Sequence, residues 1–249
     1  MNKNTVASMK AHAEAAYPNE SCGLVIAGGK KDRYVPCRNK AEDGNHFIMD
    51  AEDYANAEDV GQVLAIVHSH PDGPEQASEG DKVACEASGL PWLIVIVKDG
   101  AATGVTRIEP DGYQPPLIGR QFFHGVLDCY TLVQDVYQRE LGITLPHFDR
   151  ENGWWEGEQE LYLDNFGKAG FREVTDGSLK PYDVILMQRQ SERANHAGVF
   201  LGTVELKEAP HIHPVPDAML HHSYGRLSER VVYGGYWKQI TRMVIRYDR

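Results

Sequence analysis

The chain has 249 residues, of which 42% are hydrophobic and 24% charged, so it can bury a core and is not disordered throughout. Its 25 Lys and Arg stand against 36 Asp and Glu, and the net charge of −11 is not that of a protein that binds nucleic acid or an anionic membrane. No apolar run approaches the roughly 20 residues of a membrane span, and no targeting segment is visible at the start. We therefore expect no nucleic-acid partner, no membrane insertion and no signal peptide.

Helix and strand patterns alternate over the first half of the chain. Ala-rich or polar helical patterns are predicted at 5–16, 50–62 and 78–88, and short apolar runs typical of buried strands at 22–27, 63–67 and 91–97. Interleaved helices and strands predict an α/β layered domain. The stretch 109–116, with three prolines and a glycine, then predicts a linker. We accordingly expect two domains, at 1–112 and 118–249.

The second half begins with a helix and continues with strands. The helical pattern covers 129–141 and ends at Gly142, a typical C-cap residue. Strand patterns follow at 182–187, 197–201, 218–222 and 243–247. A helix followed by consecutive strands predicts an α+β domain with an antiparallel sheet.

Four cysteines occur in the chain, at Cys22, Cys37, Cys85 and Cys129. Their density is far below that of a disulfide-stapled scaffold, and no Cys-x-x-Cys pair suggests a zinc ribbon. We interpret them as reduced thiols of a protein made in a cytoplasm. The first three fit a buried core, because free cysteine packs as a small hydrophobic residue.

A first group of residues capable of metal chemistry surrounds the second buried strand. Side chains alternate along a strand, so His68 and His70 point to the same side and could hold one divalent metal. Asp81 could supply a third ligand and leave one zinc position open for water, and Glu20 could accept that water's proton. Each residue also has a simpler interpretation: His-x-His alone is a weak signal, Ser78 and Asp81 could form only a helix cap, and Glu20 could be a surface acid.

Taken together, these residues resemble the signature of the JAMM metallopeptidases. A Glu before a strand is followed by His-x-His-Pro and then by Ser-x-x-Asp, here Glu20, His68, His70, Ser78 and Asp81. The resemblance covers about residues 1–110 and implies an α/β/α metallopeptidase domain. It implies zinc bound by the two histidines and the aspartate, with Glu20 as the base and Ser78 stabilising the developing oxyanion.

A second group of residues centres on Cys129, which begins the helix of the second half with Asp128 as its expected N-cap. The positive end of a helix dipole favours thiolate over thiol. Cys129 also shares a helical face with apolar residues and could be simple core. His196 opens an apolar strand and His221 lies on a later one, so a nucleophile, a base and an orienting group are all present.

This pattern resembles the NlpC-type papain-like cysteine peptidases, which cleave peptide stems of bacterial peptidoglycan. Their Asp-Cys at a helix start corresponds to Asp128-Cys129, and their His-x-Gly on a strand to His196-Ala-Gly198. The resemblance covers about residues 118–249 and implies Cys129 as the nucleophile, His196 as the base and His221 as the orienting residue. Two departures stand out: Tyr130-Thr131 replaces the usual Ser-Gly, and an insertion at 203–217 lengthens the spacing, so His222 is an alternative to His221.

Two further motifs receive structural interpretations. A second His-x-His-Pro, at 211–214, has neither a buried strand before it nor a Ser-x-x-Asp helix after it, so we expect a solvated loop. Trp154 and Trp155 are expected in a core or an interface rather than in a sugar-binding platform.

The fusion of the two modules in one chain resembles lambda-type phage tail-tip assembly proteins. It implies a protein made in the host cytoplasm that later lies at the virion tail tip, with peptidoglycan peptides and other tail-tip proteins as partners. It also implies two peptidase modules that act during tail assembly or penetration of the host wall. Two alternatives stay open, a non-catalytic assembly or structural protein of the tail tip and a cellular peptidoglycan peptidase.

Overall fold

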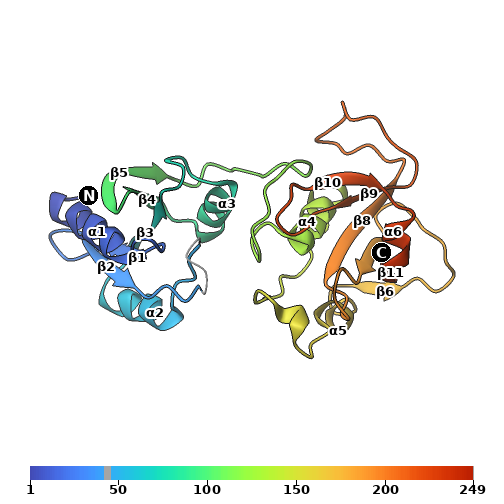
Figure 1. Cartoon of the computed structure of the whole chain (residues 1–249), viewed down its shortest axis with the longest axis horizontal. Coiled ribbons are helices and arrows are strands. Elements are labelled where there is room, and N and C mark those ends of the chain that lie inside the picture. The colour runs from blue at the N-terminus through green and yellow to red at the C-terminus, as the bar shows by residue number, and fades with distance from the viewer. Residues whose placement is uncertain (42–45, 249) are drawn as a thin grey trace. The chain divides into compact units, whose positions relative to one another are not determined.

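The computed structural model describes residues 1–41 and 46–248, and the chain forms two compact units, Met1–Gln114 and Pro115–Arg249 (Figure 1). Each unit has its own sheet and its own buried clusters of apolar side chains. Within the described residues, no helix is both long and apolar enough to cross a membrane.

The first unit is built on a five-stranded mixed sheet. In spatial order its strands are β2 (Arg33–Cys37), β1 (Cys22–Ile26), β3 (Val63–Pro71), β4 (Trp92–Lys98) and β5 (Ala101–Ile108). Strands β3 and β4 are parallel, and the other pairs are antiparallel. The two central strands β3 and β4 are almost wholly buried, which explains their continuous apolar sequence.

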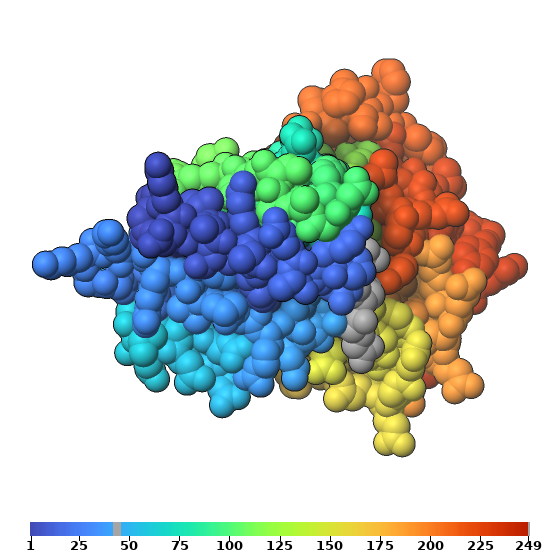
Figure 2. Space-filling view, turned by 60° about the vertical axis from the view of Figure 1, so that its left-hand side comes forward, coloured from blue at the N-terminus to red at the C-terminus, as the bar shows by residue number. Residues whose placement is uncertain are grey.

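Helices cover both faces of this sheet. Helix α1 (Lys3–Ala16) buries Met9 and Ala13 against one face, whereas α2 (Ala51–Val60) and α3 (Glu79–Ser88) bury apolar side chains against the other. In Figure 2 the dark-blue segment that contains α1 lies between the light-blue segment of edge strand β2 and the green segment of edge strand β5. The predicted α/β/α architecture is confirmed.

The second unit is built on a six-stranded antiparallel sheet. In spatial order its strands are β10 (Glu229–Val232), β9 (Ala218–His221), β8 (His196–Gly202), β7 (Val184–Met187), β11 (Thr241–Tyr247) and β6 (Phe171–Glu173). Helix α4 (Cys129–Val136) packs against one face, and the short helix α6 (Tyr236–Gln239) contributes Trp237 to the apolar cluster on the other. The predicted α+β class with an antiparallel sheet is confirmed.

The elements that the sequence patterns do not predict lie mainly at the margins of the two sheets. Strands β2, β5, β6 and β10 are more exposed than the central strands, and their sequences are correspondingly mixed in polarity. The helix predicted at 129–141 is α4 followed by a π-helical turn, Tyr137–Leu141, and ends at Gly142 in the left-handed region. Edge strands form because a partner strand pairs with them, and this information is absent from their local pattern.

Candidate active sites

Strand β3 carries His68 and His70 to the face of the first sheet that α3 covers. The Nε2 atoms of the two rings are 3.1 Å apart. Asp81, in the first turn of α3, lies with Oδ1 3.1 Å from His68 Nε2 and Oδ2 3.3 Å from His70 Nε2. The alternation of side chains along β3 and the position of Asp81 in the first turn of α3 therefore bring three possible ligand atoms together. This is the only such cluster among the residues that the structure describes.

Neighbouring groups fix both imidazole rings of this cluster. The His68 ring stacks on Phe47 with centroids 4.9 Å apart and meets Trp92 edge to face at 5.4 Å. His70 Nδ1 lies 2.8 Å from the carbonyl oxygen of Pro74, which accepts a hydrogen bond from Nδ1–H; in the neutral ring this leaves the lone pair on Nε2. The Nε2 atom of His70 thus faces the shared point as a metal ligand requires.

The protonation states of His68 and Asp81 suit a divalent cation. Burial lowers the pKa of His68 and so favours the neutral imidazole. Burial alone would raise the pKa of Asp81, but its hydrogen bonds with His68 and His70 outweigh that effect and hold the pKa well below its usual range. A carboxylate and two imidazoles form a common donor set for zinc. The residues present therefore fit a metal ion.

Ser78 and Asp81 form a capping box at the start of α3. Ser78 Oγ accepts a hydrogen bond from the N–H of Asp81 at 3.0 Å, and Asp81 Oδ2 accepts one from the N–H of Ser78 at 2.7 Å. The cap is compatible with a role of Asp81 as a metal ligand, because the carboxylate that caps the helix also faces the histidines. The Ser78 hydroxyl accepts in the cap and keeps its own proton to donate elsewhere.

Glu20 lies just before β1, and β1 pairs with β3, the strand that carries the two histidines. Cys22 pairs with His68 across the two strands, and the N–H of Ser69 donates to the carbonyl of Ser21. Burial lowers the pKa of His70, but hydrogen bonds to Asp81 and Pro74 and the charges of Asp81 and Glu20 raise it more. Glu20 also lines a cavity of about 560 Å³, although His68, His70 and Asp81 do not line it.

Cys129 begins α4 and is 9% exposed. Asp128 is the N-cap residue, with Oδ1 accepting from the N–H groups of Tyr130 and Thr131 at 2.9 Å each. The Cys129 Sγ lies 3.2 Å from the hydroxyl of Tyr162. Hydrogen bonds from this hydroxyl and from the N–H of Ala197 in β8 lower the pKa of the thiol. The thiol therefore sits between the helix start, the beginning of β8 and Tyr162.

The protonation state of Cys129 differs from the expectation based on the helix dipole. Burial raises the pKa of the Cys129 thiol, and this effect outweighs the lowering by the Tyr162 hydroxyl and the Arg150 charge. Burial has the largest effect, and the negative charge of Asp128 adds to it. The resting side chain is consequently a neutral thiol.

His196 and His221 lie next to each other on neighbouring strands. His196 Nε2 is 3.1 Å from His221 Nδ1, and the two rings meet edge to face. Gly198 lies opposite His221, where a Cβ atom would come within 3.2 Å of His221 Cβ and 2.8 Å of Met219 Sδ. The glycine of the His-x-Gly motif therefore leaves the space that His221 needs beside His196.

His222 has different neighbours from His221. Its Nε2 lies 3.1 Å from the carbonyl oxygen of Arg226, and its ring packs edge to face on Phe122 at 5.0 Å. Successive side chains of a strand point to opposite faces, which separates His222 from His196. The geometry thus favours His221 over His222 as the partner of His196.

The structure does not join the thiol directly to its expected base. Among the described residues, no hydrogen bond links Cys129 Sγ to His196, and the side-chain contact of the thiol is Tyr162. Burial lowers the pKa of His196 well below its usual value, and the nearby charges of His221 and Arg189 add to this effect. Nucleophile and base are both neutral at rest, and such pairs commonly tighten only when substrate binds.

An ion pair beside the thiol is not indicated by any sequence motif. Arg150 contacts Asp128 through Nε at 3.0 Å and Nη2 at 2.9 Å, and both side chains are buried. The guanidinium also lies 5.0 Å from the centre of the Tyr130 ring. Arg150 comes from a long loop without a local pattern, so no sequence signal connects it to the helix start.

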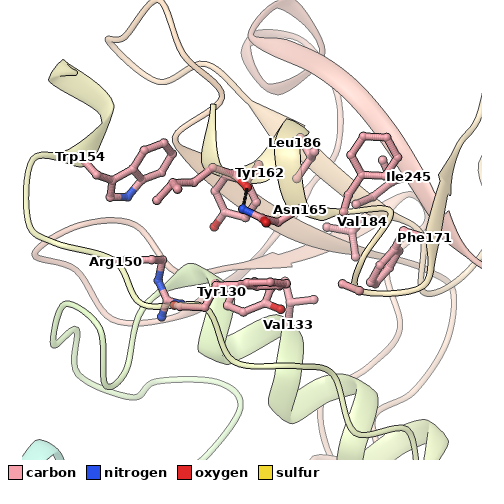
Figure 3. A pocket seen from close by; sticks show the side chains of 14 residues that line it. Tyr130, Val133, Arg150, Trp154, Tyr162, Asn165, Phe171, Val184, Leu186 and Ile245 are labelled. Atoms are coloured by element: carbon pink, nitrogen blue, oxygen red, sulfur yellow. Dashed lines mark hydrogen bonds between the residues drawn. The ribbon is translucent and has the colours of Figure 1, made fainter. Parts of the chain in front are cut away.

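Tyr162, which contacts the thiol, also lines an apolar cavity of about 40 Å³ (Figure 3). Figure 3 shows Trp154 and Arg150 toward one end of the lining, Tyr162 and Asn165 in the middle, and Phe171 and Ile245 toward the other end. Trp154 thus packs at the edge of the core. The second His-x-His-Pro lies in a loop, where His211 and His213 are exposed.

Comparisons with known proteins match both units. Residues 2–109 match a family described as prokaryotic homologs of the JAB domain, and residues 119–246 match the NlpC/P60 family. Tail tip assembly protein K of Escherichia phage N15 is 42% identical over 99% of this chain and 96% of its own length. The protein of the same name from Escherichia phage lambda is 38% identical over 80% of this chain and 89% of its own. A solution structure from Desulfitobacterium hafniense covers 43% of this chain and 88% of its own, at 27% identity and a TM-score of 0.34.

Proposed function

Because the chain belongs to the tail tip assembly protein K family, with a JAB-like and an NlpC/P60 domain, we propose that it is a tail-tip peptidase with two separate sites. The name of its relatives supports a location in the virion tail and contacts with other tail proteins, after synthesis in the host cytoplasm. The observation that carries the peptidase proposal is the hydrogen-bonded His196–His221 pair in a domain that also carries Cys129 at a capped helix start.

In the NlpC/P60 domain, Cys129 is the nucleophile and His196 the base. As substrate binds, His196 takes the thiol proton and the sulfur attacks the peptide carbonyl carbon. The carbon–nitrogen bond breaks, and His196 returns the proton to the leaving amine. Water then hydrolyses the thioester and restores the thiol, while His221 orients His196. The substrates are peptide stems of peptidoglycan, in keeping with wall opening by a tail.

In the JAB-like domain, His68, His70 and Asp81 would hold a zinc ion. The ion, when bound, supplies a Lewis acid that lowers the pKa of water. Glu20 accepts the proton of the attacking water, and Ser78 donates a hydrogen bond to the oxyanion. The substrate is a peptide or isopeptide bond in a tail protein or in the wall.

The cysteine site is tested by product analysis. Purified protein is incubated with peptidoglycan fragments, and the products are followed by mass spectrometry. We expect stem-peptide cleavage by the wild type and none by Cys129→Ala or His196→Ala, with Cys22→Ala as the matched buried-thiol control that keeps activity. Identical products from wild type and Cys129→Ala would refute the cysteine mechanism.

The metal site is tested by elemental analysis. We expect about one zinc per chain in the wild type and a large loss in His68→Ala and in Asp81→Asn, whereas exposed His211→Ala keeps its metal. Full metal content in both variants would refute the assignment. Circular dichroism identifies any variant that has merely lost its fold.

A second function, non-catalytic assembly, is favoured by one observation. The Cys129 thiol is buried, neutral and in contact with Tyr162, as a purely structural cysteine would be. A structural protein would contain no stoichiometric zinc, and its Cys129 would react with alkylating reagents no faster than Cys22.

A further inference from the structure

Glu229 lies directly across from His221 on edge strand β10. The two residues are paired in the ladder between β9 and β10, so their side chains share one face of the sheet. Glu229 Oε1 is 3.9 Å from His221 Nε2, and the Glu229 side chain is 48% exposed. His221 therefore lies between His196 on one side and the carboxylate of Glu229 on the other.

His221 has a free hydrogen-bonding atom on the Glu229 side. Its Nδ1 contacts His196 Nε2 at 3.1 Å and Ser223 Oγ at 3.3 Å. Its Nε2 is buried and has no hydrogen-bond partner among the described residues. The carboxylate of Glu229 lies 3.9 Å from this atom, and rotation of the half-exposed Glu229 side chain can shorten the distance to that of a hydrogen bond.

His221 is neutral at pH 7, so it carries a single N–H whose position matters. Burial and the nearby charges of Arg189 and His222 lower its pKa to about 4. A neutral imidazole donates from one nitrogen and accepts at the other. The Ser223 hydroxyl can donate or accept, so it suits either tautomer and does not decide between them.

The tautomer of His221 sets that of His196. With its proton on Nε2, His221 accepts at Nδ1 from His196 Nε2–H, and His196 Nδ1 keeps the lone pair that a base needs. With its proton on Nδ1, His221 donates to His196 Nε2, and the proton of neutral His196 moves to Nδ1, which blocks the base. We propose that Glu229 is a positioning residue that holds the proton of His221 on Nε2 and thereby keeps His196 in the base tautomer.

Trp237 restricts the other side of the His221 ring. Its ring centroid lies 4.4 Å from that of His221 at an interplanar angle of 57°. Without Glu229, a proton on His221 Nε2 would be a buried donor without a partner, which disfavours this tautomer. Removal of the carboxylate should therefore shift the proton of His221 toward Nδ1.

The decisive experiment is nitrogen NMR of the full chain labelled with ¹⁵N-histidine, with the His221 signals assigned by their loss in His221→Asn. We expect the shifts of an Nε2-protonated imidazole in the wild type. Glu229→Leu should increase the Nδ1-protonated form, Glu229→Gln should have a smaller effect because its amide oxygen still accepts, and Glu173→Leu on edge strand β6 should have none. An Nδ1-protonated wild-type His221, or an unchanged tautomer in Glu229→Leu, would overturn the proposal.

A second readout connects the tautomer to the thiol. Cys129 alkylation at pH 7 should slow in Glu229→Leu and recover in part in Glu229→Gln, while thermal unfolding stays cooperative. Equal alkylation rates in wild type and Glu229→Leu would contradict the role in positioning His196. The role rests on the proposed peptidase function, but the tautomer measurement does not need a substrate. An Nε2 tautomer that depends on Glu229 in a protein without peptidase activity would refute the proposed function alone.

Discussion

At the residue scale, the chemistry of the second unit depends on contacts that shift protonation. Cys129 and His196 are both buried, and desolvation favours the neutral form of each. The Tyr162 hydroxyl opposes this effect at the sulfur, because a hydrogen bond to the thiolate lowers its pKa. Tyr162 thus increases the fraction of Cys129 that is present as thiolate.

Replacing Tyr162 by Phe should make the thiol less acidic. The ring and its packing stay, and only the hydroxyl that stabilises the thiolate is lost. A hydrogen bond of about 1 kcal/mol corresponds to roughly a fivefold smaller thiolate fraction. Alkylation rates of Cys129 from pH 7 to 10 measure this shift, with exposed Tyr236→Phe as the control. A faster reaction in Tyr162→Phe would contradict the assigned role.

At the scale of elements, the start of α4 is held by more than its own cap. Asp128 accepts hydrogen bonds from the first turn and pairs with buried Arg150 of the following loop. Burial raises the pKa of Asp128, but the charge of Arg150 and hydrogen bonds from Thr131 and Gly125 lower it more. The helix that carries Cys129 is therefore tied to the loop through one carboxylate.

Asp128→Asn tests this connection. Asparagine still caps a helix, so the substitution removes the charge and leaves Arg150 buried without a counterion, which should cost about 3 kcal/mol of unfolding free energy at pH 7. Asp50→Asn, at the cap of α2 beside exposed Arg38, is the matched control with a much smaller loss expected. Urea unfolding of both variants measures the difference, and equal losses would contradict a special role of the buried pair.

The effect of Asp128→Asn on the free energy of unfolding should depend on pH. The folded pKa of Asp128 is lowered, so its contribution is complete above the unfolded value of about 4 and is lost as the pH falls through the folded pKa. The difference in unfolding free energy between wild type and Asp128→Asn should therefore become smaller below about pH 4. A gap that stayed constant between pH 7 and pH 2.5 would show that the charge is not the cause.

At the scale of the whole molecule, each of the two units contains one site and its own core. The candidate metal ligands belong to Met1–Gln114, and the candidate cysteine site to Pro115–Arg249. Ligand binding stabilises only the folded unit that holds the ligand, by about 2.7 kcal/mol at a concentration of 100 Kd. A bound metal should consequently stabilise the first unit and leave the stability of the second unit unchanged.

Calorimetry tests this separation. We expect two thermal transitions, with zinc raising the melting temperature of the first unit and leaving the other within error. Asp81→Asn should abolish the zinc-dependent shift, and Cys129→Ala should keep it. Zinc that raised both transitions equally, or neither, would contradict the prediction.

Much of the architecture and most of the candidate residues follow from the sequence. Buried strands such as β4 are continuously apolar, and the period of two along β3 puts His68 and His70 on one face whatever surrounds them. The capping pattern of Ser78 and Asp81 specifies the start of α3, and the family motifs specify which side chains to consider. These features are local, so they can be predicted from the order of residues alone.

The groups that act on those residues from other segments of the chain become apparent in the folded protein. Tyr162, Arg150 and Glu229 lie 33, 22 and 8 residues from their partners Cys129, Asp128 and His221, and nothing in their local sequence indicates the contact. Long-range pairing also created the edge strands. The choice of His221 over His222 and the neutral state of Cys129 depend on the face of the sheet and on burial. Desolvation and strand pairing belong to the assembled fold, because they arise only when segments far apart in the chain exclude water together.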